Sequence, residues 1–265
     1  MVSHGLTRVL VTNDDGIDSP GLRHLALAAR RIAEQVVVAA PAQESSGSSA
    51  ALGAVEEHGR IPVEDRRLTG LDDVPAHAVQ ALPGFIALIA GQGAFGSPPD
   101  LLLSGINRGA NTGRAVLHSG TVGAALTAVH DGCRALAVSL DLGSPPHWSA
   151  AEEVTAWILP LLLSAPAGTL FNLNVPNRPL DQLKGVRGAE LAPFGTVQTT
   201  VTERGRGFVR VSLSENGPTA DPGAEPRTDA DLLAHGYASL SVLTAVSGAP
   251  GGPELRAALA GLGRS

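Results

Sequence analysis

Two adjacent carboxylates near the start of the chain are the first residues whose chemistry needs an explanation. Asp14 and Asp15 follow the apolar run Arg8–Thr12 after one intervening residue, Asn13, and the run has the composition of a buried strand. Two neighbouring carboxylates repel one another when both are ionised, and a bound cation relieves that repulsion. Residues 13–16 are also typical of a turn that ends a strand. A turn and a metal site therefore both stay open from this stretch alone.

Further oxygen ligands follow the next strands along the chain. Ser46 comes after the apolar run 36–40, and Asn107 and Asn111 come after the run 101–104. The carboxyl ends of parallel strands lie at one edge of a sheet, and α/β sheets bind ligands at that edge. All of these side chains offer oxygen and none offers sulfur, which favours Mg²⁺, Mn²⁺ or Ca²⁺ as the bound ion.

The sequence Ser119-Gly120-Thr121 is typical of a helix start that binds an anion. Ser119 is the expected N-cap, and the first turn of a helix leaves backbone N–H groups unpaired at the positive end of the helix dipole. Two hydroxyl groups add to these donors. A phosphate bound here beside a divalent cation predicts phosphoryl chemistry.

Apolar strands alternate with helices through most of the chain. We expect one helix to begin at Pro20 with Ser19 as its N-cap, and another over residues 75–90 that Pro83-Gly84 should break or kink. The elements expected later are a helix from Ser119, a strand over Arg134–Leu140, a helix over 149–164 and a strand over 169–175. This alternation predicts an α/β fold with a Rossmann-like, mostly parallel sheet and helices on both faces.

The sequence changes character after Pro176. We therefore divide the chain into a Rossmann-like core over 1–176 and a β-rich arm over 177–265. Within the arm we expect β-like runs over 177–227, a short helix over 228–234, a strand over 237–243 and a terminal helix over 252–262.

Composition excludes several classes of function. The 265 residues carry a net charge of −6 with no basic block, which argues against duplex nucleic acid as a partner. The single cysteine, Cys133, excludes an intrachain disulfide and a cysteine-based metal cluster, and we interpret it as a buried structural thiol. No apolar run is long enough to span a membrane, and no segment resembles a signal peptide. We expect a cytoplasmic protein with no membrane partner.

Several stretches of the sequence together resemble the SurE-type survival-protein phosphatases, a family of 5′/3′-nucleotidases. The resemblance spans most of the chain, and its first and third stretches are long and specific. The matching stretches are VTNDDGIDSPG at 11–21, SGSS at 46–49, SGINRGANTG at 104–113, HSGTV at 118–122 and NLNVP at 172–176, with shorter matches at 228–229 and 236–237.

The resemblance implies a divalent-metal-dependent phosphatase that hydrolyses nucleoside monophosphates. It implies one cation per subunit, Mg²⁺ or Mn²⁺ with Ca²⁺ as a substitute in crystals, held by Asp14, Asp15, Ser46 and Asn107. The substrate-binding residues that it implies are Asn13, Asn111, Ser119, Gly120 and Thr121. It also implies a homodimer or homotetramer that uses the C-terminal arm. The sequence departs from the family at 73–78, at Thr127 and at 241–243, and none of these positions is a proposed ligand.

On this interpretation Asp14 and Asp15 are the catalytic residues and water is the nucleophile. A bound cation makes water more acidic, and either carboxylate can accept its proton, so both assignments stay open. A covalent mechanism at Asp14 is disfavoured because it needs a companion lysine, and the only lysine is Lys184 in the arm. Two alternatives remain: a metal-dependent nucleotide-binding protein without catalysis, and a phosphatase for another small phosphate monoester.

Three basic residues lie near these motifs. His118 either contacts the substrate or is simply exposed. Arg108 is expected to face solvent or another subunit, although a guanidinium there can also reach a phosphate. His24, on the first helix, is interpreted as an ordinary solvated or partly buried side chain.

Overall fold

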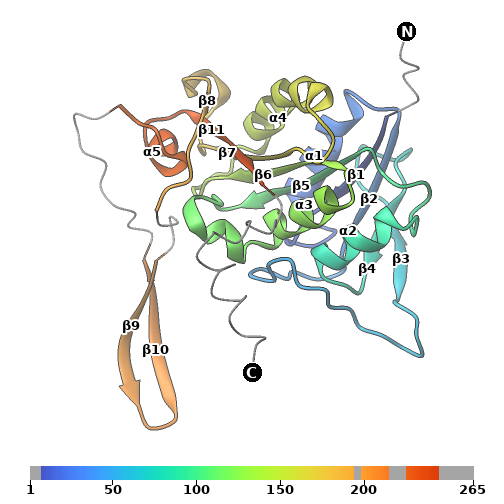
Figure 1. Ribbon diagram of the computed structural model, residues 1–265, viewed down its shortest axis with the longest axis horizontal. Helices are drawn as coiled ribbons and strands as arrows, with labels where there is room; N and C mark the ends of the chain where they lie inside the picture. The colour runs from blue at the N-terminus through green and yellow to red at the C-terminus, as the bar shows by residue number, and fades with distance from the viewer. Residues whose placement is uncertain (1–6, 194–197, 215–224, 245–265) are drawn as a thin grey trace, which may run out of the picture.

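A nine-stranded sheet forms the centre of the computed structural model (Figure 1), which describes residues 7–193, 198–214 and 225–244. The strand order is β3-β4-β2-β1-β5-β6-β7-β11-β8. The strands are β1 Arg8–Thr12, β2 Gln35–Pro41, β3 Val63–Arg66, β4 Ala76–Val79, β5 Leu101–Arg108, β6 Arg134–Leu140, β7 Leu170–Val175, β8 Val186–Gly188 and β11 Ala238–Leu243. The six strands from β4 to β7 in this order are parallel, whereas β3 and β11 run antiparallel to their neighbours β4 and β7.

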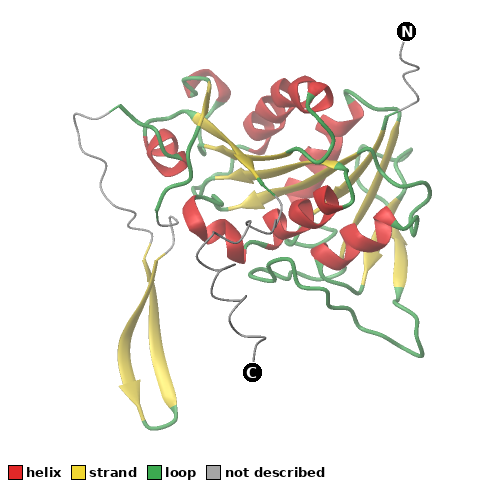
Figure 2. Cartoon of the chain, in the orientation of Figure 1, coloured by secondary structure: helices red, strands yellow, loops and turns green. Residues whose placement is uncertain are grey.

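Two helices cover each face of the sheet (Figure 2). Helices α1 (Pro20–Arg30) and α4 (Trp148–Ser164) pack together on one face, and α2 (Pro83–Gly91) and α3 (Gly120–His130) pack together on the other. Alternate residues of each strand enter opposite cores, so Val9 and Val11 contact the α1 side and Leu10 contacts the α3 side. Burial on both faces is the reason that the central strands are continuously apolar. The predicted α/β fold is confirmed.

The helix starts at Ser19 and Ser119 lie where the sequence predicts them. Ser19 is the N-cap of α1 and accepts a hydrogen bond from the Leu22 backbone N–H at 3.3 Å. Ser119 is the N-cap of α3 and accepts one from Val122 at 3.1 Å. Each serine ends a loop and begins a helix, and the buried side of each helix packs on the sheet. The caps therefore fix the ends of both loops at the edge of the sheet.

The single helix expected over 75–90 is wrong. Residues Ala76–Val79 form β4, which pairs in parallel with β2 and is largely buried. Pro83 then begins α2 instead of kinking a longer helix. Proline is well tolerated at a first helical position because the N–H that it lacks has no intrahelical partner there.

Strand β5 is longer than the sequence predicts, and this places a site residue. The apolar run in the sequence ends at residue 104, but β5 continues to Arg108 and its pairing with β6 shifts register between Ser104 and Asn107. Gly105 has a φ of +129°, and a Cβ there would lie 2.2 Å from the Val138 carbonyl oxygen. Glycine therefore permits the irregular strand end that delivers Asn107 to the carboxyl edge.

The segment after Val175 contributes both to the main sheet and to a separate hairpin. Strands β8 and β11 join the main sheet beside β7, so the sheet continues past residue 176, and the division into 1–176 and 177–265 stays a prediction. The hairpin consists of β9 (Gln198–Gly205) and β10 (Phe208–Ser214), and α5 (Asp229–Ala234) begins at the N-cap Thr228. The terminal helix expected over 252–262 lies outside the described residues. Within the described part of the chain, no helix combines the length and apolar character that a membrane crossing needs.

Candidate active site

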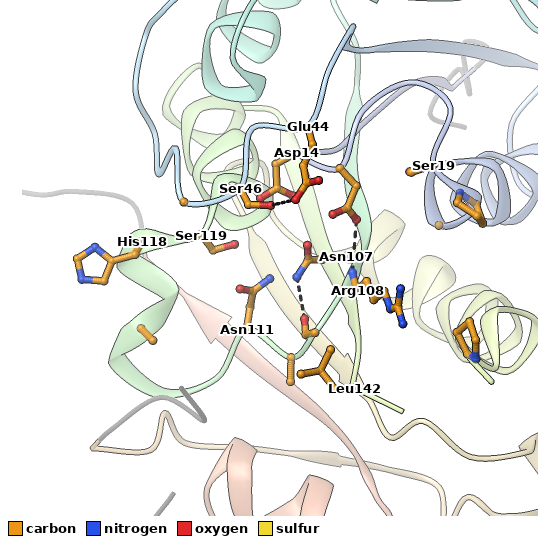
Figure 3. Close-up of a pocket in the computed structure, with 18 of the residues that line it drawn as sticks. Asp14, Ser19, Glu44, Ser46, Asn107, Arg108, Asn111, His118, Ser119 and Leu142 are labelled. Carbon is orange, nitrogen blue, oxygen red and sulfur yellow. Dashed lines mark hydrogen bonds between the residues drawn. The ribbon is translucent and has the colours of Figure 1, made fainter. Parts of the chain in front are cut away.

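A cavity of about 940 Å³ opens at the carboxyl ends of β1 and β5 (Figure 3). Six residues singled out in the sequence line it although they come from distant parts of the chain. They are Asp14, Asp15, Ser46, Asn107, Asn111 and Ser119. The parallel strand order explains this convergence, because neighbouring strands all end at this edge.

Asp14 is buried and held by the start of α3. Its side chain is 4% exposed, and its Oδ1 accepts a hydrogen bond from the Thr121 hydroxyl. Burial raises the pKa of Asp14 above its usual value, while donors from Thr121 and from the Gly120 and Thr121 backbone oppose that rise. A buried carboxylate with fixed donors on one side is oriented in advance for a cation on the other.

Asp15 is less buried than Asp14, and its carboxylate has less hydrogen-bond support. Its Oδ2 accepts one long hydrogen bond, at 3.4 Å, from the Arg108 backbone N–H. Burial, then the negative charge of Asp14, raises the pKa of Asp15 to about 6, and Glu44 adds to this effect. The ionised form of Asp15 is therefore disfavoured, and a positive charge at this position would stabilise it.

The remaining predicted ligands present neutral oxygens to the same space. Asn107 donates its Nδ2 to the Gly109 carbonyl at 2.7 Å, which leaves its Oδ1 directed toward the carboxylates (Figure 3). Ser46 is exposed and donates its hydroxyl to Glu44 Oε1 at 2.8 Å. No group of three or more His, Cys, Asp or Glu side chains suited to a metal occurs in the described ranges. Two carboxylates with amide and hydroxyl oxygens form a hard donor set that fits Mg²⁺ or Mn²⁺ and not zinc.

The start of α3, where the sequence predicts a bound phosphate, has an anionic side chain against it. That anion is Asp14, and a Cβ at Gly120 would lie 2.8 Å from Asp14 Oδ2. Glycine at position 120 is what allows this close approach. Of the three residues predicted to contact phosphate here, Ser119 lines the cavity, whereas Gly120 and Thr121 pack behind it against Asp14.

Asn13 is likewise not brought into the cavity, although it was predicted to bind substrate. Its side chain is fully buried. It donates to Ser19 Oγ at 2.7 Å and to the Gly16 carbonyl at 3.1 Å. These bonds close the turn that carries Asp14 and Asp15, so Asn13 shapes the site from behind.

Of the three basic residues named from the sequence, two line the cavity and one does not. His118 and Arg108 are both exposed and both line the cavity. His24 lies elsewhere, half-buried, with its Nδ1 2.7 Å from Glu152 Oε2. Cys133 is only half-buried, and burial raises its thiol pKa to about 12.

A network that sequence reasoning missed fixes the backbone of Asn111. The Asn111 carbonyl accepts hydrogen bonds from Asn172 Nδ2 at 2.9 Å and from Asn174 Nδ2 at 3.0 Å. Its N–H donates to Asn174 Oδ1 at 2.7 Å, and its side-chain Nδ2 donates to Ser139 Oγ at 2.9 Å. The available signal was the pair of asparagines inside the otherwise apolar strand β7, because a buried polar side chain needs a partner.

Asp229 forms a hydrogen bond to the loop after β5 at Gly113, two residues beyond Asn111. Its buried carboxylate accepts hydrogen bonds from the backbone N–H groups of Gly113, Ala192 and Ala230 at 2.8, 2.9 and 2.9 Å. Burial raises the pKa of Asp229, and these donors oppose the rise. The carboxylate thus joins the loop after β5 to two C-terminal segments, which is why the site needs the chain beyond residue 176.

Comparison with known sequence families decides the relationship. Residues 9–198 match the family described as survival protein SurE. The chain belongs to the SurE family. It is 36% identical over 239 residues to the 5′/3′-nucleotidase SurE of Edwardsiella ictaluri, covering 89% of each chain. It is 37% identical over 240 residues to the 5′/3′-nucleotidase SurE of Erwinia tasmaniensis, again with 89% of each covered.

A solved SurE structure has the same fold. The chain matches the crystal structure of the SurE protein from Aquifex aeolicus with a TM-score of 0.72 and 27% identity. The match covers 89% of this chain and 93% of that one. The SurE resemblance inferred from the motifs is confirmed, and the family match over residues 9–198 includes the strand ends that carry the candidate site.

Proposed function

We propose that this SurE-family chain is a phosphoric monoester hydrolase that releases phosphate from nucleoside monophosphates, as a 5′/3′-nucleotidase. The observation that supports this most is the meeting of Asp14, Asp15 and Asn107 in one cavity beside Ser119. The cavity is large enough for a nucleotide, and the SurE relatives are named as nucleotidases.

The activity proposed here depends on one divalent cation, Mg²⁺ or Mn²⁺. Asp14 and Asp15 would hold it with Asn107 Oδ1, and Ser46 would join them by releasing its hydrogen bond to Glu44. When bound, such a cation supplies Lewis-acid polarisation of a phosphoryl oxygen and makes water more acidic. The donor chemistry supports this assignment, because two repelling carboxylates and two neutral oxygens suit a hard cation.

The carboxylates of Asp14 and Asp15 have different environments, and we propose a different role for each. Asp14 is fixed by Thr121 at the start of α3 and serves as an oriented, negatively charged ligand. Among the described residues Asp15 accepts one long hydrogen bond, and it lines the cavity. Asp15 is therefore the group that we propose takes the proton of the attacking water.

Ser119 and Asn111 are the residues that we propose orient the phosphate. The Ser119 hydroxyl accepts from Val122 N–H and keeps its own proton for an oxygen in the cavity. Asn111 uses one of its two side-chain N–H bonds on Ser139, so the other remains for a substrate oxygen. Fixed donors of this kind take up charge on the phosphoryl oxygens without reorganising during the reaction.

A covalent aspartyl-phosphate route has no support from the side chains that line the cavity. Lys184, the companion that such a route needs, lies 5.6 Å from the ring centre of Tyr237 and does not line the cavity. Water therefore remains the nucleophile that we propose.

Phosphate release from a panel of nucleoside monophosphates and sugar phosphates, with and without EDTA, tests the proposal. We expect release that requires Mg²⁺ or Mn²⁺ and that falls at least about a hundredfold in Asp14→Asn. Asp18→Asn is the matched control, since Asp18 is exposed in the same turn and does not line the cavity. Nucleotide binding without phosphate release would instead support the binding-protein alternative and contradict catalysis.

A further inference from the structure

We propose that the end of the cavity remote from Asp14 is a subsite for the uncharged base of a nucleotide, and this inference rests on the proposed function. The subsite is an apolar wall, defined here as Pro20, Leu142, Pro146 and Trp148. None of these residues belongs to the predicted metal or phosphate positions.

The wall is continuous with the carboxylate end of the same cavity. In Figure 3 Leu142 lies on the opposite side of Asn107 and Arg108 from Asp14. The Leu142 side chain lies beside Gly109, 3.6 Å from where a Cβ on that residue would be. The Trp148 ring packs beside Gly21 in the first turn of α1. A ligand whose phosphate contacts Ser119 can therefore extend its remaining part toward these side chains.

Leu142 is unusual because a large apolar side chain is left 46% exposed next to a polar site. An isolated surface leucine needs no explanation, but one that lines a cavity with a tryptophan and two prolines marks a binding surface. Arg108 is a charged residue that lines the cavity near Leu142 (Figure 3). The four side chains of the wall itself carry no charge, so the wall suits a flat, uncharged and weakly polar group.

Asn177 holds the wall in place before any ligand arrives. Its Oδ1 accepts a hydrogen bond from His147 N–H at 2.8 Å, and its Nδ2 donates to the Pro145 carbonyl at 3.2 Å. These bonds join the loop after β6, which carries Leu142 and Pro146, to the end of β7. A surface that is ordered in advance loses less entropy when it binds a base.

The first test compares two phosphate esters that differ in their leaving group. Leu142→Ala is expected to lower kcat/KM for adenosine 5′-monophosphate about fivefold, mostly through KM, because apolar contact with a remote base is uniform binding. The same variant should leave kcat/KM for glycerol phosphate unchanged. Leu161→Ala is the control, since Leu161 is a similarly exposed leucine outside the cavity. Equal effects on the two esters, or no effect on either, would overturn the subsite.

The second test measures ligand binding at the apolar wall without relying on catalysis. The chain has two tryptophans, so Trp157→Phe leaves Trp148 as the single indole fluorophore. We expect adenosine to change the Trp148 emission saturably and inorganic phosphate to leave it unchanged. An emission that adenosine does not alter would count against the subsite. If the unaltered protein hydrolyses no ester, the proposed function fails, and this measurement still decides the wall by itself.

Discussion

The hydroxyl of Thr121 donates a hydrogen bond to Asp14 Oδ1 and so joins the first turn of α3 to the end of β1. The two residues are 107 positions apart, and both are buried. Their contact means that the helix start orients the carboxylate instead of leaving the helix end open to a ligand. The chemistry of Asp14 therefore depends on an element that does not itself line the cavity.

Thr121→Val tests this dependence. Valine keeps the shape of threonine and removes the donor, so Asp14 should lose orientation and the affinity for Mn²⁺ should fall about tenfold or more. Mn²⁺ titration of phosphate release measures the effect. Thr121→Ser, which retains the hydroxyl, should restore most of the affinity. Equal Mn²⁺ affinity in all three proteins would show that the bond does not matter.

Asp15→Asn is expected to stabilise the metal-free protein at neutral pH. Folding raises the pKa of Asp15 from 3.8 to about 6, so between these pH values the folded chain holds more protons than the unfolded chain. The free energy of unfolding therefore falls as pH rises through this window. Removing the charge should recover about 1 to 2 kcal/mol at pH 7 after allowance for solvent screening, and little at pH 4.

Urea unfolding in EDTA at both pH values measures this difference. Added Mn²⁺ should reverse the order, so that the unaltered protein becomes more stable than Asp15→Asn. Asp18→Asn, at an exposed aspartate in the same turn, should change neither result. A variant that is less stable than the unaltered protein in EDTA at pH 7 would contradict the repulsion inferred at this site.

Asn174→Ala is expected to loosen the loop that carries Asn111. The substitution leaves the half-buried Asn111 N–H without its partner, and an unsatisfied donor of this kind costs about 1 to 3 kcal/mol of stability. KM for the substrate should rise as well. Ser241→Ala is the matched control, because its buried hydroxyl has no hydrogen-bond partner among the described residues. Unchanged stability and KM in Asn174→Ala would contradict a role for this hydrogen-bond network in the site.

Cys133 is expected to react slowly with thiol reagents in the folded protein. Burial raises its pKa to about 12, which lowers the thiolate fraction at pH 8 roughly a hundredfold or more relative to a free cysteine. The rate of reaction with a disulfide reagent in native buffer and in denaturant measures this. Equal rates in the two conditions would contradict a protected thiol.

Local patterns predict the central fold of this chain well. The bounds of β1 and β6 and the caps Ser19 and Ser119 agree with the sequence, because an apolar run and a capping serine are each visible in the local sequence. The failure over residues 75–90 has a tertiary cause: the four residues of β4 are a strand because β2 offers them a parallel partner. A short apolar run carries too little periodicity to reveal that partner.

The site was predictable only in part, for a related reason. Oxygen ligands at strand ends could be found from the sequence because parallel strands end together. The contacts behind them could not be, since the bond from Thr121 to Asp14 and the hold of Asp229 on Gly113 join residues more than 100 positions apart. A local sign existed only for the contacts of Asn111, because its partners Asn172 and Asn174 are polar residues inside an apolar strand.

An anomalous difference map from crystals grown with Mn²⁺ tests the central claim most directly. The account predicts one peak per chain, about 2.1 Å from oxygens of Asp14, Asp15 and Asn107, and no such peak in Asp14→Asn crystals. Mn²⁺ bound elsewhere, or a cavity without a peak in crystals that hold Mn²⁺ at other positions, would contradict it.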